Sequence, residues 1–480
     1  MVIRNVLDFF HIFTIFMGVL YAVRDKPVSG GCYNAVMPTP TPITRRRRRR
    51  RVNVLQILVL LAVLAGILYL IPPIRERVDG RIYMWRLQII AILRPPEKEV
   101  FVPQAALTPA PTPVVTLPPT AVPSATPTTI PTTAEQNATV EPTGSPTPAP
   151  TAIPTAVTLK GVRYMDQHGV RNYCAPSTLG MALSYYGWKG SRTDIGKVVK
   201  PYDDDYNVMP YELADYTVEK ANLNAVTRIG GTLEQLKTLV AGGFPVILET
   251  GVYEIDLSNE LSWMGHYVLV TGYDDANSEF ILQDAYNGPD HHMKYKKLES
   301  EWRAFNFLYL IVYSPDKEKQ LMTLMGPAWD ETTANRAAYD RANLEISQMT
   351  DMDQYFAWFN RGTAMVKLQD YAGAAQAYDQ AFALYQTLPE KTRPFRMVWY
   401  QTGPYQAYYY SGRYQDLVNL ADFTLGLARH PGLEESNYWR AKGYAAIGQR
   451  DKAITDLRLT LQIHPNFEPS LLELQSLGAN

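Results

Sequence analysis

The stretch Arg171–Trp188, RNYCAPSTLGMALSYYGW, decides how the middle of this 480-residue chain is interpreted. Its apolar side chains recur three, four and seven residues apart, which is the spacing of one face of a helix. Pro176 suits the first turn of that helix, and Gly187 suits its end. Cys174 therefore lies at the amino terminus of a predicted amphipathic helix.

Cys174 is one of only two cysteines in the chain, and the other is Cys32. A predicted membrane span separates them, so a disulfide is not expected, and a lone thiol lacks the cysteine-rich spacing of a zinc site. Cys174 is then either a small buried side chain or a reactive thiol. Its place at a helix amino terminus favours the thiolate, because the helix dipole stabilises negative charge there.

The chain has the composition of a globular protein, with 46% hydrophobic and 19% charged residues. Its length predicts two or three domains. A net charge of −1 gives no general electrostatic affinity for nucleic acid, so no nucleic-acid partner is expected. The charge is unevenly placed, however, because Arg45–Arg51 is an unbroken run of arginines.

An uncharged apolar run over residues 52–71 predicts a transmembrane helix. At about 1.5 Å per helical residue it covers roughly 30 Å, the thickness of a bilayer core. The preceding arginines predict that residues 1–51 are a cytoplasmic or partly membrane-inserted segment and that the later domains lie outside the cytoplasm, because positive flanks stay inside. A weaker apolar stretch, residues 6–23, is either a second span or an artefact of start-site choice, since Met37 opens an arginine-rich leader of its own.

Two segments without a predicted core follow. Residues 72–101 form a juxtamembrane segment whose short apolar patch suits a helix lying at the membrane surface. Residues 102–157 consist mostly of Pro, Thr, Ala and Val, which neither build a core nor form a helix or sheet. They predict a disordered, extended stalk.

Residues 158–315 return to globular composition, and helices followed by a run of strands predict an α+β domain. A helix opened by a capping box at Thr232 follows the Cys174 helix. His291 and His292 are expected in a solvated polar turn. The β-rich runs are Pro245–Thr250, His266–Tyr273, Glu279–Ala285 and Asn306–Tyr313.

Residues 330–480 are predicted to be almost wholly helical and repetitive. Segments that begin at Trp358 and Asn437 both place small residues where two helices would cross, and a looser copy lies between them. They resemble tetratricopeptide repeats, and a generic helical bundle is the alternative. Stacked helix pairs present a concave surface that suits a peptide or protein partner.

A catalytic cysteine needs a base, a group that orients the base, and oxyanion donors. His266 opens a predicted strand and can face the helix that begins at Cys174, although a structural histidine is the alternative. Asp284 ends the next strand and lies beside His266 if the two strands pair. Gln167 precedes Cys174 closely, so its amide can join the Cys174 N–H as an oxyanion donor, unless it is simply solvated.

Three segments together resemble cysteine-peptidase family thirty-nine, whose founding members process bacteriocins by cutting after double-glycine leaders. They are Met165–Trp188, Gly265–Asp275 and Phe280–Gly288. The resemblance extends over residues 157–315, about a third of the chain, and implies a papain-like fold with the nucleophile at a helix start. It adds no metal or organic cofactor.

Carried over by this resemblance, Cys174 is the nucleophile, His266 the base, Asp284 the group that orients the base, and Gln167 an oxyanion donor. Ala175 stands where the family usually has Gly. No ATP-binding cassette follows, so leader removal coupled to export is not implied.

The sequence thus predicts a multidomain protein: a membrane anchor, an α+β papain-like cysteine peptidase domain and an all-α tetratricopeptide-like domain. Its expected function is that of a membrane-anchored, extracytoplasmic peptidase that hydrolyses peptide bonds by a Cys–His–Asp mechanism. Two alternatives stay open. One is a catalytically silent binding scaffold, and the other is a thiol acyl transferase or amidase of transglutaminase-like type.

Overall fold

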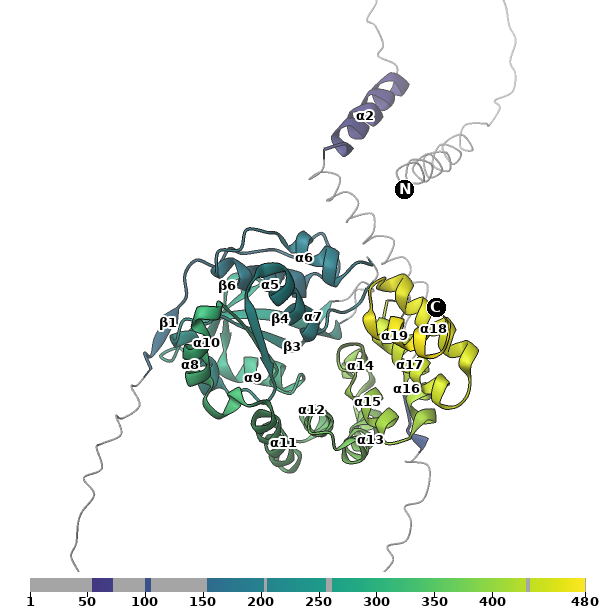
Figure 1. Ribbon diagram of the computed structural model, residues 1–480. Coiled ribbons are helices and arrows are strands. Elements are labelled where there is room, and N and C mark those ends of the chain that lie inside the picture. The colour runs from purple at the N-terminus through teal and green to yellow at the C-terminus, as the bar shows by residue number, and fades with distance from the viewer. Residues whose placement is uncertain are drawn as a thin grey trace, which may run out of the picture. The chain divides into compact units, whose positions relative to one another are not determined.

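The structure is a computed structural model, and it describes residues 54–71, 100–104, 153–202, 205–255, 261–428 and 432–479 (Figure 1). The chain divides into two compact units, Met1–Gly66 and Ile67–Asn480. The predictions made for the arginine run, for residues 6–23, for the interfacial helix and for most of the stalk lie outside the described residues. Both predicted domains, 158–315 and 330–480, belong to the second unit.

The apolar run predicted to span a membrane contains the helix α2, Val54–Tyr69. This helix has 16 residues, whereas a bilayer core requires about 20. Among the described residues, no helix is both long enough and apolar enough to cross a membrane. The anchor at 52–71 stays a prediction from the sequence.

One antiparallel sheet organises residues 156–313, with the order β2-β7-β3-β4-β5-β6 and β1 paired with β4 (Figure 1). The predicted β-rich runs coincide with β3, β4, β5 and β7. The strands are β1 (Ala156–Thr158), β2 (Asn224–Arg228), β3 (Val246–Ile255), β4 (Leu261–Asp274), β5 (Glu279–Asp284), β6 (Gly288–Lys294) and β7 (Tyr309–Tyr313).

His291 and His292, predicted to lie in a polar turn, are in the edge strand β6 instead. This strand pairs on one side only, with β5, and most of its side chains face solvent. Met293 is its one buried side chain. An edge strand with one buried residue has the polar composition of a loop, which explains the error.

Helices cover both faces of the sheet. On one face lie α5 (Cys174–Tyr185), α6 (Arg192–Val199) and α7 (Pro210–Ala221), and on the other lie α8 (Leu233–Ala241), α9 (Tyr295–Arg303) and α10 (Glu318–Met325). Side chains alternate between the faces along a strand, so Ile247 packs toward α5 while Val246 and Leu248 pack toward α8. The 3-10 turns Pro315–Lys317 and Gly326–Trp329 lead out of this region.

The rest of the described chain is all-helical, in agreement with the sequence. Gly362 lies where α12 crosses α13, because a Cβ there would come within 2.7 Å of the Tyr378 ring. The elements are α11 (Glu331–Gln348), α12 (Asp351–Lys367), α13 (Tyr371–Thr387), a 3-10 turn (Glu390–Thr392), α14 (Met397–Tyr400), α15 (Gly403–Tyr410), α16 (Tyr414–Leu427), α17 (Glu434–Ala446), α18 (Arg450–Ile463) and α19 (Glu468–Ser476).

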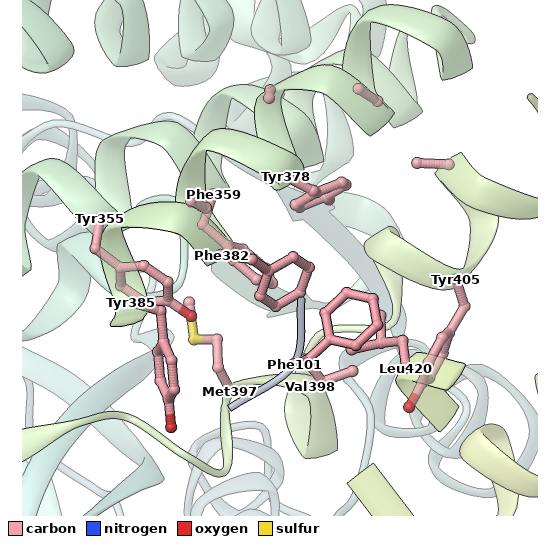
Figure 2. Packing of buried hydrophobic residues seen from close by; sticks show 14 of the residues in the cluster. Phe101, Tyr355, Phe359, Tyr378, Phe382, Tyr385, Met397, Val398, Tyr405 and Leu420 are labelled. Atoms are coloured by element: carbon pink, nitrogen blue, oxygen red, sulfur yellow. The ribbon is translucent and has the colours of Figure 1, made fainter. Parts of the chain in front are cut away.

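The short segment 100–104 packs into the core of this helical region (Figure 2). The Phe101 side chain is 6% exposed, and its ring lies 5.0 Å from that of Phe382 in an edge-on arrangement. The main-chain N–H of Gln104 donates to Asp416 Oδ1 at 2.6 Å. The predicted stalk therefore does not begin at residue 102, because residues up to 104 are held by the helices.

The sheet region and the helical region share a core. The Trp263 ring on β4 stacks on Phe305 at 5.9 Å and meets Phe356 of α12 at 6.2 Å. The Asn306 side-chain amide donates to the Asn360 main-chain oxygen, and that of Asn360 donates back to Arg303 O at 2.8 Å. The two predicted domains are thus packed against each other.

Candidate active site

Cys174 is the first residue of α5, and its side chain is half-buried. The main-chain N–H groups of Ala175 and Tyr267 donate to its sulfur. Thr178, one turn further along α5, donates its hydroxyl to Tyr267 O at 3.0 Å. These contacts fasten the start of the helix to β4 beside residue 266.

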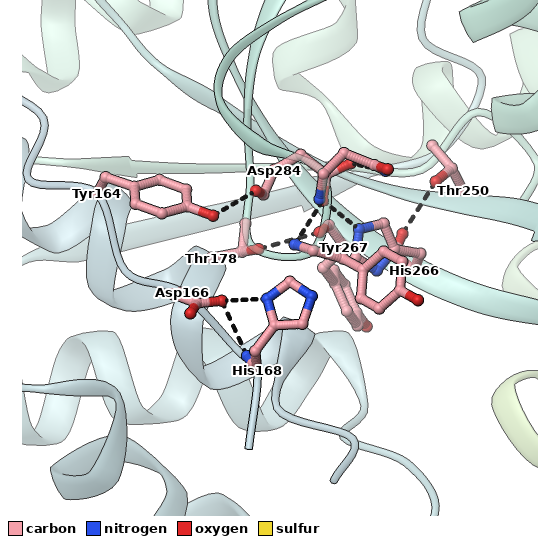
Figure 3. Close-up of polar contacts among 10 residues, drawn as sticks. Tyr164, Asp166, His168, Thr178, Thr250, His266, Tyr267 and Asp284 are labelled. Carbon is pink, nitrogen blue, oxygen red and sulfur yellow. Dashed lines mark hydrogen bonds and ion pairs between the residues drawn. The ribbon is translucent and has the colours of Figure 1, made fainter. Parts of the chain in front are cut away.

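His266 lies on β4 opposite Thr250 of β3, whose hydroxyl donates to His266 O at 3.0 Å (Figure 3). Its Nε2 is 2.8 Å from Asp284 Oδ1, and the ring also hydrogen-bonds the Cys174 thiol. Since Nε2 is paired with Asp284, Nδ1 is the ring nitrogen left for the sulfur. His266 therefore stands between the thiol and the carboxylate.

Asp284 is the last residue of β5 and is 1% exposed. Strand register shifts between Leu282 and Asp284, an irregularity of the kind that redirects side chains next to active sites. The Asp284 carboxylate accepts hydrogen bonds from the N–H groups of Tyr286 and Asn287 at 2.8 and 3.1 Å, and from the Asn287 side-chain amide at 2.8 Å. Asn287 was not predicted, although an Asn three residues after an acid at a strand end is a typical turn partner.

The electrostatics favour a charged pair. Burial lowers the pKa of His266, but its hydrogen bonds and charge interactions with Asp284 and Cys174 outweigh this and raise it to about 10. Burial raises the pKa of the Cys174 thiol, yet the hydrogen bond and charge of His266 bring it below its ordinary value. Burial likewise opposes ionisation of Asp284, whose pKa is nevertheless held well below its usual range, chiefly by His266. Both shifts act in the direction of an imidazolium paired with a thiolate.

Gln167 is anchored beside this group through its main chain, whose N–H donates to Ala285 O at 2.9 Å. Its side-chain Oε1 is buried and has no hydrogen-bond partner among the described residues. The role of Gln167 as an oxyanion donor stays a prediction. The neighbouring His168 is exposed and pairs with Asp166 (Figure 3), so the thiol's imidazole partner is His266.

A pocket of about 120 Å³ adjoins His266 and Asp284. Its charged lining comes from Glu254, Lys297 and Glu301. Burial raises the pKa of both glutamates, while the charges of Lys297 and His266 oppose that rise at Glu301. The pocket is thus polar and lies directly beside the base.

Glu249 on β3 is a buried acid that the sequence interpretation did not single out. It is 2% exposed, and it hydrogen-bonds Tyr267, whose hydroxyl donates to Val208 O at 3.1 Å. Burial raises the pKa of Glu249 well above its usual value. The available signal was an acid inside the apolar run PVILET, where a charge is not expected.

The region that contains these candidate site residues is similar to known proteins. Residues 159–310 match the model of the Peptidase_C39 like family. A crystal structure of a C39-like peptidase from Bacillus anthracis is 18% identical with a TM-score of 0.28, covering 33% of this chain and 98% of that chain. No curated protein matches. The predicted family resemblance is confirmed, and the chain combines a region similar to C39-like peptidases with an all-helical region.

Proposed function

We propose that this protein is a cysteine peptidase that hydrolyses peptide bonds with Cys174 as nucleophile, His266 as acid and base, and Asp284 as the group that orients the imidazole. The observation that carries the proposal is the continuous chain of hydrogen bonds from the thiol through the imidazole to a buried carboxylate. A purely structural cysteine has no need of a charged imidazole beside it.

In the first half of the reaction, the Cys174 thiolate attacks the scissile carbonyl carbon and the carbonyl π electrons move to the oxygen. The main-chain N–H of Cys174 is suited to bind that oxyanion, because amides in a first helical turn have no intrahelical acceptor. The Gln167 amide is the second donor in this proposal. His266 then gives its proton to the leaving amine, and a thioester remains on Cys174.

In the second half, His266 removes a proton from water, and the resulting hydroxide attacks the thioester carbonyl. The C–S bond breaks, the carboxylic acid product leaves, and the thiolate–imidazolium pair is restored. Asp284 stays ionised throughout and stabilises the imidazolium. The polar pocket beside His266 is suited to the main chain or a polar side chain of a peptide substrate.

The test uses the full chain and a proteome-derived peptide mixture, with cleavage read by mass spectrometry. The proposal predicts new peptide ends with the parent and with Cys32→Ser, and none with Cys174→Ala or His266→Ala. Cys32→Ser is the matched control because it removes the other thiol. Cleavage that survives Cys174→Ala contradicts the proposal, and so does parent protein that cleaves nothing. Transfer of added amines in place of hydrolysis would favour the acyl-transferase alternative.

We further infer that the helical region is a stack of tetratricopeptide-like pairs that binds a peptide segment. Consecutive helices such as α12 with α13 and α17 with α18 support this interpretation. The packing of Phe101 among these helices supports the proposal, because a side chain from outside the helical region already occupies its core. Anchoring at residues 52–71 and an extracytoplasmic location stay predictions from sequence, which protease protection in intact cells would test.

A further inference from the structure

A second group of titratable side chains lies where the sheet region meets the helical region. Glu212 is in the first turn of α7, Glu434 is the first residue of α17, and His464 follows the last residue of α18. Glu212 is 8% exposed and Glu434 is 2% exposed, while the His464 side chain is 17% exposed. The cluster is therefore nearly closed to water.

These three side chains converge without hydrogen bonds to one another, and His464 lies at ion-pair distance from both glutamates. Glu212 Oε1, Glu434 Oε2 and His464 Nδ1 are all buried and have no hydrogen-bond partner among the described residues. His464 Nδ1 lies 3.8 Å from Glu212 Oε1 and 3.5 Å from Glu434 Oε1. One ligand atom from each residue falls within 4.8 Å of the other two, a spacing that can hold a metal ion.

Other contacts fix the orientation of the three groups. The second oxygen of Glu212 accepts the Met209 N–H at 2.7 Å as part of the α7 cap, which leaves Oε1 for the cluster. The Glu434 main-chain oxygen is contacted by the Thr460 hydroxyl of α18 at 3.4 Å. His464 caps α18 through its N–H, which donates to Thr460 O at 2.8 Å. The site is thus built from the ends of packed helices, which do not reorient freely.

The surroundings carry an excess of buried acids. Asp205 and Glu435 are also buried, at 1% and 7% exposed. Lys200 is a buried cation near them, and its Nζ donates to the Asp205 main-chain oxygen at 2.5 Å. Burying carboxylates costs free energy unless they are paired or coordinated to a metal. A bound cation would therefore lower the cost of burying these acidic side chains together.

The donor set points to a transition metal. Neutral imidazole suits zinc and its neighbours, whereas calcium and magnesium take oxygen ligands. Zinc bonds of about 2.0–2.1 Å place tetrahedral ligand atoms roughly 3.3 Å apart, close to the separations here.

We propose that Glu212, Glu434 and His464 bind one zinc ion, with water as the fourth ligand, and that this ion joins the sheet region to the helical region. The ion would also help to hold in place the segment that leads to Cys174. Asn172, just before Cys174, donates its side-chain amide to Asp205 O at 3.1 Å within the same junction. The proposal does not depend on peptidase activity.

The test measures zinc binding by the full chain after chelation and dialysis, using a competing chromophoric chelator and elemental analysis. The parent is expected to hold one zinc per chain, and Glu434→Gln and His464→Ala are expected to bind at least about 100-fold more weakly. Glu435→Gln is the matched control: it alters the next residue of α17, whose carboxylate already accepts the Tyr211 hydroxyl at 3.3 Å. It should retain zinc within about tenfold of the parent.

Thermal unfolding is also measured with and without zinc. The shift in unfolding temperature that zinc causes in each protein tests the site even if a variant is less stable than the parent. Without metal, the unfolding temperature of Glu434→Gln is expected to be no lower than that of the metal-free parent, because the amide has nearly the size and shape of the carboxyl group. With zinc, only the parent and Glu435→Gln should gain stability. The proposal is overturned if the parent binds no stoichiometric zinc, if the variants bind it as the parent does, or if calcium or magnesium binds in preference to zinc.

Discussion

The two buried titratable clusters of this protein differ in how their charges are satisfied. Around Asp284, every member has a partner: two main-chain N–H groups, a side-chain amide and an imidazole surround the carboxylate. Around Glu434, three buried ligand atoms, one each from Glu212, Glu434 and His464, have no hydrogen-bond partner among the described residues. The first cluster is satisfied by hydrogen bonds within the protein, and the second is the site at which we propose a zinc ion.

The largest effect is expected at the satisfied cluster, where Cys174→Ala should lower peptide hydrolysis by at least about 1,000-fold. Cys174 and His266 act as one unit. The double variant Cys174→Ala/His266→Ala should therefore hydrolyse peptides no more slowly than Cys174→Ala alone. Steady-state hydrolysis of the peptides found in the screen measures this. An additive loss in the double variant would show that the two residues work separately.

The second prediction is that zinc stabilises the protein through the Glu212, Glu434 and His464 cluster. Zinc at 100 to 1,000 times its dissociation constant is expected to raise the parent's free energy of unfolding by about 3–4 kcal/mol. Glu434→Gln should show almost none of this gain. Denaturant titrations in zinc and in chelator measure the gain in free energy of unfolding for each protein. An equal gain in the parent and in Glu434→Gln would contradict zinc binding by Glu434.

A smaller effect is expected from Asp284→Asn, and it should depend on pH. The folded-state pKa of Asp284 is depressed, so its ionisation stabilises the fold above the unfolded-state value of about 3.9. The difference in free energy of unfolding between parent and variant, on the order of 2 kcal/mol, should hold at neutral pH and shrink as the pH falls below about 4. If the difference in free energy of unfolding between parent and variant grew as the pH fell, a depressed pKa of Asp284 would be contradicted.

The smallest effect is expected from Asn287→Ala. It removes one hydrogen bond to Asp284 and leaves both main-chain donors in place. Because residue 287 is exposed and water can replace its amide, the loss should be about 1 kcal/mol or less. Denaturant unfolding measures it, and a loss above that of Asp284→Asn would show that Asn287 has another role.

Much of the sheet region could be predicted from sequence because its signals are local. The helix that begins at Cys174 shows helical periodicity, and the strands of His266 and Asp284 contain apolar runs, although the 14-residue β4 begins before the run that the sequence marks. Pairing of β4 with β5 follows from their short connection, and it brings His266 to Asp284. The composition of the chain's last third likewise predicted its helices.

Other features depend on contacts between distant segments, which local patterns do not encode. Phe101 lies in a stretch that continues into Pro-rich sequence, and only the folded helices reveal its site. Glu212, Glu434 and His464 each occur at a helix end, where acids at the start and a histidine at the finish are common. Their convergence appears only when the helical region packs against the sheet region.

The most direct test of the account is the pH dependence of Cys174 alkylation by iodoacetamide in the full chain carrying Cys32→Ser. The charged Cys174–His266 pair predicts rapid labelling that changes only a few-fold between pH 6 and pH 8. In the same chain with His266→Ala, the rate should fall about tenfold per pH unit below the pKa of an ordinary thiol, about 8.5. The same steep dependence in both proteins would contradict an activated thiolate and leave the cysteine a structural residue.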